Sequence, residues 1–253
     1  MLKYLIYKLS LIYAALVFKS LYYGQLLAVF ITNIHPLRPG SIPDSLRTTM
    51  RIFRVRKHAA VLPLRLSNLQ RLCREIDKRS ITGDVVECGV YNGGSASILA
   101  SACIRSPLNR NIWLFDSFEG LPEPCIEDGI KSIGWKGWCH GDLARVNTIL
   151  SELSIPESRV RIVKGWFQDT FPSVQIHDIA LLHIDADWYE SVKLCLEKFY
   201  DSVRPGGFVV IDDYGHWEGS RKATDEFLER RGIDIELVRV GYTCRYFRKP
   251  LNT

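Results

Sequence analysis

The stretch GDVVECGVYNGGSA, residues 83–96, decides the fold of this chain. A short apolar run ends at Glu87 and passes into a turn that holds Gly89, Gly93 and Gly94, and a helical pattern follows Ser95. Glycine lets the backbone approach a ligand closely, and the first N–H groups of the next helix can bind an anion. The sequence therefore predicts a strand, a ligand-binding turn and a helix. The alternative is an ordinary glycine-rich turn.

The 253-residue chain continues this alternation of short apolar runs and helix-length connections downstream. The runs occupy residues 84–89, 112–116, 159–165, 179–185, 206–213, 234–240 and 243–249. Such connections indicate parallel pairing, whereas the last two runs are two residues apart and can pair only as an antiparallel hairpin. We therefore expect an α/β fold with a mostly parallel, Rossmann-like, seven-stranded sheet and a C-terminal antiparallel hairpin. An amphipathic helix within residues 64–83 precedes the sheet.

Three aspartates follow two of the expected strands. Asp185 ends the fourth run, and Asp212 and Asp213 end the fifth. A carboxylate at the end of a buried strand costs several kcal/mol to desolvate unless it is paired or binds a metal. Three hard oxygen ligands at one edge of a sheet match Mg²⁺. The sequence predicts a Mg²⁺ site on these three residues; the alternative is that they cap helices and form turns.

The second and third runs end in residues suited to a nucleoside. Asp116 stands where an acidic residue would hold a ribose diol, although it could also cap a helix or a turn. After the third run, Trp166 or Phe167 could cover an adenine ring, although core packing is the more ordinary role for an aromatic side chain. The G-x-G-x-x-G pattern of nicotinamide-binding folds is missing, which argues against a nucleotide-dependent oxidoreductase.

Five stretches together resemble a known family. They are GDVVECGVYNGGSA (83–96), LFDSFEGLPEP (114–124), KGWFQDTFP (164–172), HIDADWYES (183–191) and GGFVVIDDYGHWEG (206–219). In this order, over about residues 62–230, they resemble the metal-dependent sugar O-methyltransferases typified by macrocin O-methyltransferase. The expected sheet likewise resembles that of class I methyltransferases.

The resemblance implies an enzyme that uses S-adenosylmethionine and Mg²⁺ to methylate a sugar hydroxyl of a glycosylated natural product, glycolipid or polysaccharide. The implied cofactor-binding residues are Glu87, Gly89, Tyr91, Asn92, Gly93, Ser95, Asp116, Ser117, Gly165, Trp166 and Asp185. The metal would lie on Asp185, Asp212 and Asp213. The candidate catalytic bases are Asp185, Asp187 and His216, the last because histidine titrates near neutral pH. Catechol O-methyltransferases, which look like distant relatives, use a lysine three residues after the first metal aspartate. Here that position is Trp188, so their mechanism is not implied.

Residues 120–150, with Trp135, Trp138 and His140, could form a lid whose indoles stack on a sugar, or could pack as a helix and loop on the sheet. A cofactor-binding protein of the same fold, associated with a membrane and without turnover, is the alternative function.

The N-terminal third carries the basic excess, with 14 Lys/Arg against 3 Asp/Glu in residues 1–80. Residues 1–34 are apolar and interrupted by Lys3, Lys8 and Lys19. They fit a helix that lies on a membrane surface, an arm that packs on the core or on a second subunit, or a cleaved signal. The proline-containing stretch 34–49 predicts a linker. We therefore expect an arm and linker at residues 1–45 and a methyltransferase domain at residues 46–253.

Seven cysteines without a C-x-x-C pair suggest neither a zinc site nor a redox motif, and they fit a reducing cytosol. We expect a cytoplasmic protein with possible contact to the inner face of the membrane, and a homo-oligomer is possible. Nucleic-acid binding is not expected, because the basic residues lie on an apolar arm.

Overall fold

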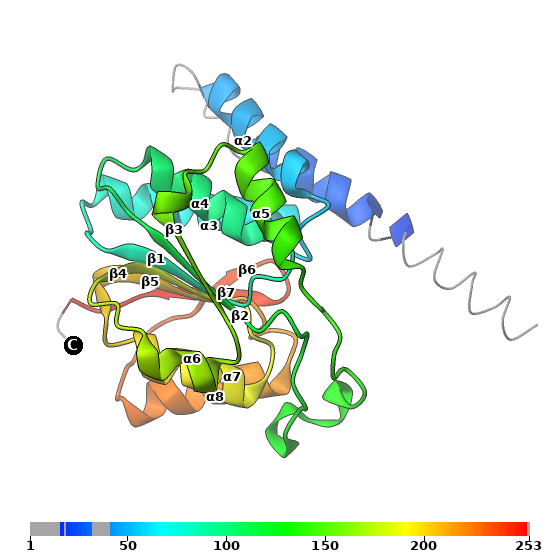
Figure 1. Cartoon of the computed structure of the whole chain (residues 1–253), viewed down its shortest axis with the longest axis vertical. Helices are drawn as coiled ribbons and strands as arrows, with labels where there is room; N and C mark the ends of the chain where they lie inside the picture. Colours follow the sequence, from blue (N-terminus) through cyan, green and yellow to red (C-terminus); the bar gives the residue numbers. More distant parts are fainter. Residues whose placement is uncertain (1–15, 18, 32–40, 252–253) are drawn as a thin grey trace, which may run out of the picture.

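A seven-stranded sheet with helices on both faces forms the body of the molecule (Figure 1). The computed structural model describes residues 16–17, 19–31 and 41–251. The strands are β1 (Asp84–Cys88), β2 (Ile112–Asp116), β3 (Val160–Lys164), β4 (Ile179–Ile184), β5 (Val203–Ile211), β6 (Val238–Val240) and β7 (Cys244–Arg248). Their order is β3-β2-β1-β4-β5-β7-β6, with β1 to β5 parallel and β7 antiparallel to both of its neighbours. The predicted sheet and hairpin are confirmed, although β6 is shorter than the predicted run 234–240.

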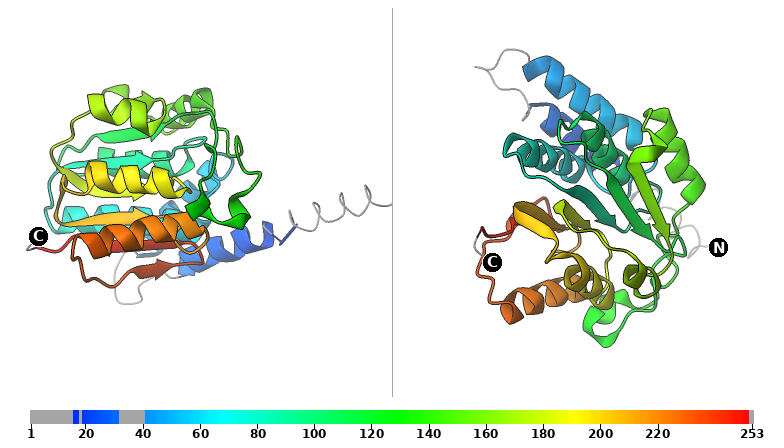
Figure 2. Two further views of the ribbon diagram at one scale, coloured as in Figure 1. Left: turned by 90° about the horizontal axis from the view of Figure 1, so that it is seen from below. Right: turned by 60° about the vertical axis from the view of Figure 1, so that its left-hand side comes forward.

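Each face of the sheet has its own layer of helices (Figures 1 and 2). One layer contains α3 (Pro63–Lys78), α4 (Gly94–Arg105) and α5 (Leu143–Glu152), with α2 (Ser41–Val55) packed outside α3 and α4, and the other contains α6 (Phe167–Thr170), α7 (Tyr189–Phe199) and α8 (Glu218–Arg230). Short 3-10 turns, η1 (Ile126–Asp128), η2 (Ile130–Ser132), η3 (Glu157–Arg159) and η4 (Phe171–Ser173), complete the chain.

The two faces of the sheet are both apolar. Alternate residues of a strand point to opposite faces, so Val85 belongs to the core under α3 and α4, and Val86 to the core under α7 and α8. All six residues of β4 are buried, which explains why five of them are apolar. The exception in β4 is His183, a fully buried ionisable residue.

The predicted linker at residues 34–49 is wrong over its second half, where helix α2 begins at Ser41. Pro43 does not prevent this helix, because the N–H groups of a first helical turn have no intrahelical partner to lose. The first part of the expected linker and residues 1–15, with Lys3 and Lys8, lie outside the described residues. The proposed boundary at residue 45 falls inside α2.

The N-terminal helix (residues 19–31) packs along α2. The Tyr22 hydroxyl donates to the Ile52 carbonyl at 3.2 Å, and the Ser45 hydroxyl donates to the Phe30 carbonyl. Val29 and Ile52 join a core cluster that reaches Ile98 in α4 and Ile149 in α5. Within the described ranges, no helix has the length and apolar character that crossing a bilayer requires.

The segment after α2 continues onto the glycine-rich turn. The Gly94 N–H donates to the His58 carbonyl at 3.0 Å, and a Cβ on Gly94 would lie 2.4 Å from that of Ala59. The start of α4 is thus covered by residues that follow the N-terminal helices.

Candidate functional site

A cavity of about 790 Å³ opens at the carboxyl ends of the parallel strands. Its wall includes the four aspartates Asp185, Asp187, Asp212 and Asp213, here called the acid cluster. Seven other residues from the candidate cofactor and catalytic sets also line it: Gly89, Tyr91, Asp116, Ser117, Gly165, Trp166 and His216. The sheet therefore gathers most of the candidate residues into one place.

Four candidate cofactor residues do not reach the cavity wall. Glu87, Asn92, Gly93 and Ser95 are buried beneath it. The Asn92 side-chain oxygen accepts from the Asp142 N–H at 3.0 Å, and Gly93 takes a left-handed conformation before α4. These two residues shape the turn from below.

The turn depends on Gly89 and Asp116. Gly89 has φ +91°, and a Cβ there would lie 1.8 Å from the Asp185 carbonyl oxygen. Asp116 Oδ2 accepts from the N–H groups of Val90 at 2.6 Å and Tyr91 at 2.8 Å, and Oδ1 accepts from Phe118 at 2.7 Å. Asp116 thus braces the turn from the neighbouring strand, as the turn-forming reading of this residue requires.

The acid cluster holds more negative charge than its surroundings balance. Burial, followed by repulsion from neighbouring aspartates, raises the pKa of Asp185 and Asp187 well above the usual range and that of Asp213 to about 6. Asp212 differs: burial opposes its ionisation, but Arg65 and His183 outweigh burial and lower its pKa. A further cation would relieve this repulsion.

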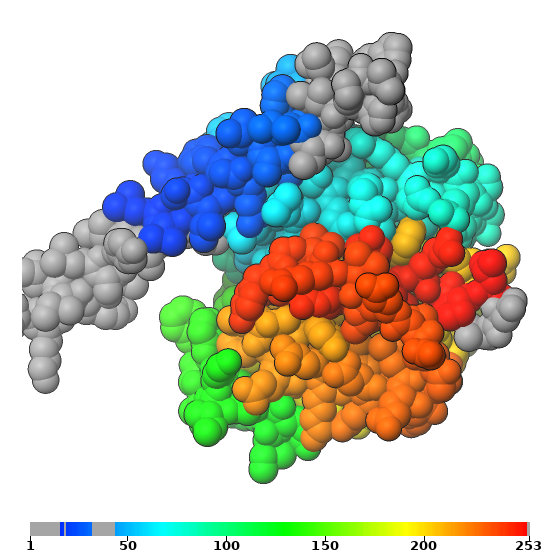
Figure 3. Space-filling view, turned by 180° about the vertical axis from the view of Figure 1, so that it is seen from behind, coloured from blue at the N-terminus to red at the C-terminus, as the bar shows by residue number. Residues whose placement is uncertain are grey.

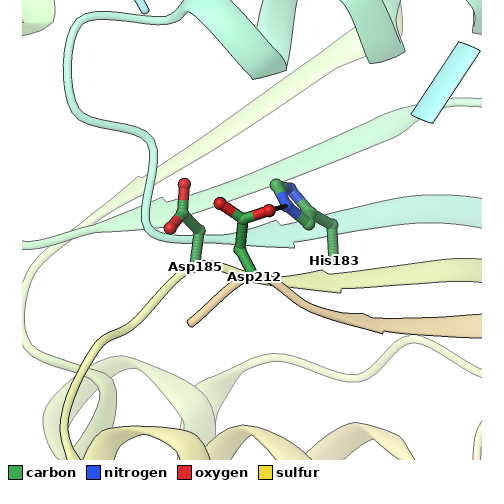
Figure 4. A group of neighbouring side chains, drawn as sticks. All are labelled: His183, Asp185 and Asp212. Carbon is green, nitrogen blue, oxygen red and sulfur yellow. Dashed lines mark ion pairs between the residues drawn. The ribbon is translucent and has the colours of Figure 1, made fainter. Parts of the chain in front are cut away.

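Two charged partners of the cluster were not predicted. Arg65, in the first turn of α3, forms an ion pair with Asp212 Oδ2. His183 lies beside Asp212 (Figure 4), with its Nε2 3.8 Å from Asp212 Oδ1 and its Nδ1 2.9 Å from Glu87 Oε1. Burial disfavours the charged imidazole, but Asp212 and Glu87 outweigh it and raise the pKa of His183 to about 10. Ligand atoms of His183, Asp185 and Asp212 all lie within 4.8 Å of one another.

Removing Arg65 should destabilise the protein in the absence of divalent cations. Asp212 is 1% exposed, so Arg65→Met leaves a buried carboxylate without its guanidinium. We expect the free energy of unfolding to fall by about 3 kcal/mol in chelator, measured by denaturant unfolding. Saturating Mg²⁺ should then raise the melting temperature of Arg65→Met more than that of the parent.

Arg47→Met is the matched control, because Arg47 pairs with Asp44 on the surface and should change stability by less than about 1 kcal/mol. A melting temperature of Arg65→Met equal to that of the parent in chelator would contradict the importance of the buried pair.

Indoles line the side of the cavity next to the acid cluster. Trp217 Nε1 donates to Asp187 Oδ1 at 2.8 Å, and the Trp217 ring lies 4.8 Å from that of Trp188 and 5.5 Å from that of Trp135. Trp188 is buried and donates from Nε1 to the Pro122 carbonyl at 3.0 Å, so the position of the catechol enzymes' lysine has a packing role here.

Residues 120–150 divide between the cavity wall and the helical layer. Gly120, Cys125, Asp128 and Trp135 line the cavity, whereas α5 packs on α4. Trp138 and His140, expected as possible substrate contacts, are exposed and outside the cavity wall.

Comparison with known proteins gives a family match over most of the chain. The model of the family described as Macrocin-O-methyltransferase (TylF) matches residues 45–249. The chain is 32% identical over 198 residues to 8-demethyl-8-(2,3-dimethoxy-alpha-L-rhamnosyl)-tetracenomycin-C 4'-O-methyltransferase of Streptomyces olivaceus, covering 76% of this chain and 75% of that protein. It is 31% identical over 201 residues to mycinamicin III 3''-O-methyltransferase of Micromonospora griseorubida, with coverages of 76% and 78%.

Solved structures agree with the fold. The O-methyltransferase NovP superposes with a TM-score of 0.68 at 26% identity, covering 76% of this chain and 82% of NovP. The calicheamicin methyltransferase CalS11 superposes with a TM-score of 0.61 at 21% identity, covering 89% and 90%, which speaks for the fold alone.

Proposed function

Because this chain belongs to the macrocin O-methyltransferase family, and is thus an O-methyltransferase, we propose that it moves a methyl group from S-adenosylmethionine to a sugar hydroxyl. The observation that carries the proposal is the meeting of the glycine-rich turn and the acid cluster in one cavity. The names of the relatives, which act on sugar-bearing natural products, support a glycosylated acceptor.

Features of the turn support S-adenosylmethionine as the methyl donor. Gly89 lets the turn pack directly against the Asp185 carbonyl, so that the backbone of the turn itself lines the cavity where a cofactor would lie. Beneath the turn, Glu87 Oε2 is buried and has no hydrogen-bond partner among the described residues, which suits an ammonium group. A carboxylate has about four lone-pair positions, and Asp116 uses three on backbone N–H groups, so one remains for a ribose hydroxyl. Tyr91, Ser117, Gly165 and Trp166 would complete the cofactor wall.

The donor set of the acid cluster supports Mg²⁺. Asp185, Asp212 and Asp213 offer hard carboxylate oxygens. Burial and mutual repulsion raise the pKa of Asp185 and Asp213, and a bound cation would offset that repulsion. When bound, the cation would supply charge that favours the ionised form of the acceptor hydroxyl.

We propose Asp187 as the base among the three candidates. It lines the cavity, and its Oδ1 is held by Trp217, while Oδ2 remains to accept the hydroxyl proton. In this proposal Asp185 binds the metal, so it is not free to take the proton. His216 is exposed at the cavity mouth, where water competes for its ring nitrogens. The indoles of Trp135 and Trp217 line the cavity with apolar surface against which a sugar ring can pack, which would exclude water and align the hydroxyl with the methyl group.

The proposed function is tested first by calorimetric titration with S-adenosylmethionine, in chelator and in Mg²⁺. We expect saturable binding in both. Formation of S-adenosylhomocysteine with nucleotide-linked or natural-product glycosides then tests methyl transfer. Cofactor binding without product from any hydroxyl acceptor would favour the alternative of a protein without turnover, and no cofactor binding would contradict both.

We further propose that the N-terminal helices contact an anionic membrane at its cytoplasmic face. The outer side of the N-terminal helix exposes Leu21, Tyr23, Leu27 and Ile31, with Leu27 59% exposed. Figure 3 shows this dark-blue helix as an outer ridge of the molecule. Apolar ridges of this kind on a helix are typical of contact with an interface.

Helix α2 extends the apolar ridge and adds charge. Its exposed Leu46, Met50 and Phe53 recur at helical spacing, and Arg47, Arg51 and Arg54 follow beside them. Burial, followed by repulsion from four other arginines, lowers the pKa of Arg51 to about 10. This concentration of positive charge complements anionic lipid headgroups, and a membrane location suits a lipid-linked sugar acceptor.

Vesicle flotation tests the membrane contact. We expect binding to vesicles of phosphatidylcholine with phosphatidylglycerol but not of phosphatidylcholine alone. Leu27→Glu should weaken binding about tenfold or more, because it puts a charge in place of an apolar side chain that the membrane would bury. Ile130→Glu, at an even more exposed apolar residue distant in sequence, is the control and should leave binding unchanged. Unaltered binding by Leu27→Glu, or a stable dimer in solution that Leu27→Glu dissociates, would contradict this proposal.

A further inference from the structure

Three buried ionisable side chains run across three adjacent strands behind the cavity. Glu87 in β1 is in register with His183 in β4, and Asp212 directly follows β5. Strand alternation puts all three on the face covered by α3 and α4, where Val85, Leu181 and Val210 continue the row as ordinary apolar residues. Glu87 and His183 are fully buried, and Asp212 nearly so.

The imidazole of His183 lies between the two carboxylates. Its Nδ1 is 2.9 Å from Glu87 Oε1, a hydrogen bond. Its Nε2 is 3.8 Å from Asp212 Oδ1, an ion-pair contact, and has no hydrogen-bond partner among the described residues. Figure 4 shows Asp212 between His183 and Asp185, with one carboxylate oxygen turned to each side. One ring therefore faces the residue under the glycine-rich turn and a residue of the acid cluster.

Stability alone gives a poor account of this arrangement. Replacing a buried ionic group of this kind by well-packed apolar residues is often neutral or stabilising. The neighbouring positions on the same face show that apolar side chains fit there. Side chains that orient a metal ligand, by contrast, commonly affect metal affinity by about 10-fold to 100-fold.

We propose that His183 is a positioning residue that serves both ligand sites at once, through Nδ1 for the cofactor and through Nε2 for the cation. Nδ1 fixes the Glu87 carboxylate, so that its free oxygen is presented to the cofactor ammonium. Nε2 restrains Asp212 from the side opposite Arg65, so that its carboxylate faces Asp185. This inference rests on the proposed function, because it assumes a cofactor above Glu87 and a cation at the acid cluster.

Two substitutions separate the two contacts. The amide of His183→Asn falls near the Nδ1 position and keeps a donor toward Glu87, whereas that of His183→Gln falls near the Nε2 position and keeps one toward Asp212. We expect His183→Asn to weaken Mg²⁺ binding at least about tenfold and to leave S-adenosylhomocysteine binding within about threefold of the parent. We expect the reverse for His183→Gln. Calorimetry with Mg²⁺ alone and with S-adenosylhomocysteine alone measures both constants.

Lys249→Met is the control for a merely structural effect. Lys249 is buried and donates to the carbonyls of Tyr200 and Asp201 in a part of the fold outside the cavity wall. It should lower the melting temperature without changing either dissociation constant of the folded protein.

Opposite effects of the two substitutions on the dissociation constants for Mg²⁺ and for S-adenosylhomocysteine would support the proposal. Parallel losses in both variants, or unchanged constants with only a lower melting temperature, would overturn it. If one variant does not fold, the other still has one affinity that must fall and one that must stay. If neither folds, NMR of the ¹⁵N-labelled parent replaces the variants. The ring nitrogen resonances of His183 must then shift when Mg²⁺ is added alone and when S-adenosylhomocysteine is added alone. A parent that binds neither ligand would instead refute the proposed function.

Discussion

Asp212→Asn should lower methyl transfer about 1000-fold, the loss expected when a preorganised electrostatic group at the reacting centre is removed. The neutral amide keeps the size of the side chain but no longer balances Arg65 or attracts a cation. Cofactor affinity should stay within about threefold of the parent, because Asp212 does not contact Glu87 or the glycine-rich turn. Steady-state rates and calorimetry with S-adenosylmethionine measure the two effects.

Asp178→Asn is the matched control for this substitution. Asp178 is exposed and pairs with Arg204 at 3.3 Å, away from the cavity wall, so activity should be unchanged. An equal loss of cofactor binding and activity in Asp212→Asn would contradict the separation of the acid cluster from the cofactor wall.

Asp187→Asn should reduce kcat between about 100-fold and 10,000-fold, as expected for loss of a general base. Asp187 has φ +54°, a left-handed conformation that asparagine tolerates as well as aspartate does, so the backbone should be retained. The amide keeps an oxygen for the Trp217 donor and loses only the ability to take a proton. Binding of both S-adenosylmethionine and Mg²⁺ should therefore remain within about threefold of the parent.

His216→Gln decides between the candidate bases. His216 packs its ring 4.5 Å from that of Trp217 at the cavity mouth and should contribute little to kcat. A larger loss of kcat in His216→Gln than in Asp187→Asn would assign the proton to the histidine.

The sequence was most informative about the ends of the strands. Parallel strands bring their carboxyl ends to one edge, so Asp185, Asp212 and Asp213 could be placed together from strand order alone. The same reasoning put Asp116 beside the glycine-rich turn, which the structure shows as hydrogen bonds to Val90 and Tyr91.

The partners of the acid cluster could not be predicted from the sequence, because they depend on contacts between residues far apart along the chain. Arg65 reaches Asp212 across 147 positions, and nothing in its helical pattern distinguishes it from a surface arginine. His183 did leave a signal, because it lies two residues before Asp185 in a wholly apolar run and therefore on the same face. The prolines of residues 34–49 suggested a break, although Pro43 lies in the first turn of α2, where a proline interrupts no helical hydrogen bond.

The cluster that joins Val29 and Ile52 to Ile98 and Ile149 has a consequence during synthesis. A chain leaves the ribosome from its N-terminus, so the first two helices emerge long before α4 and α5, on which they pack. Val29 and Ile52 lack their partner Ile98 until 69 further residues have followed Val29 (98 − 29), and their partner Ile149 until 120 have followed it (149 − 29). The order of translation therefore leaves these apolar faces uncovered until α4 and α5 have been made.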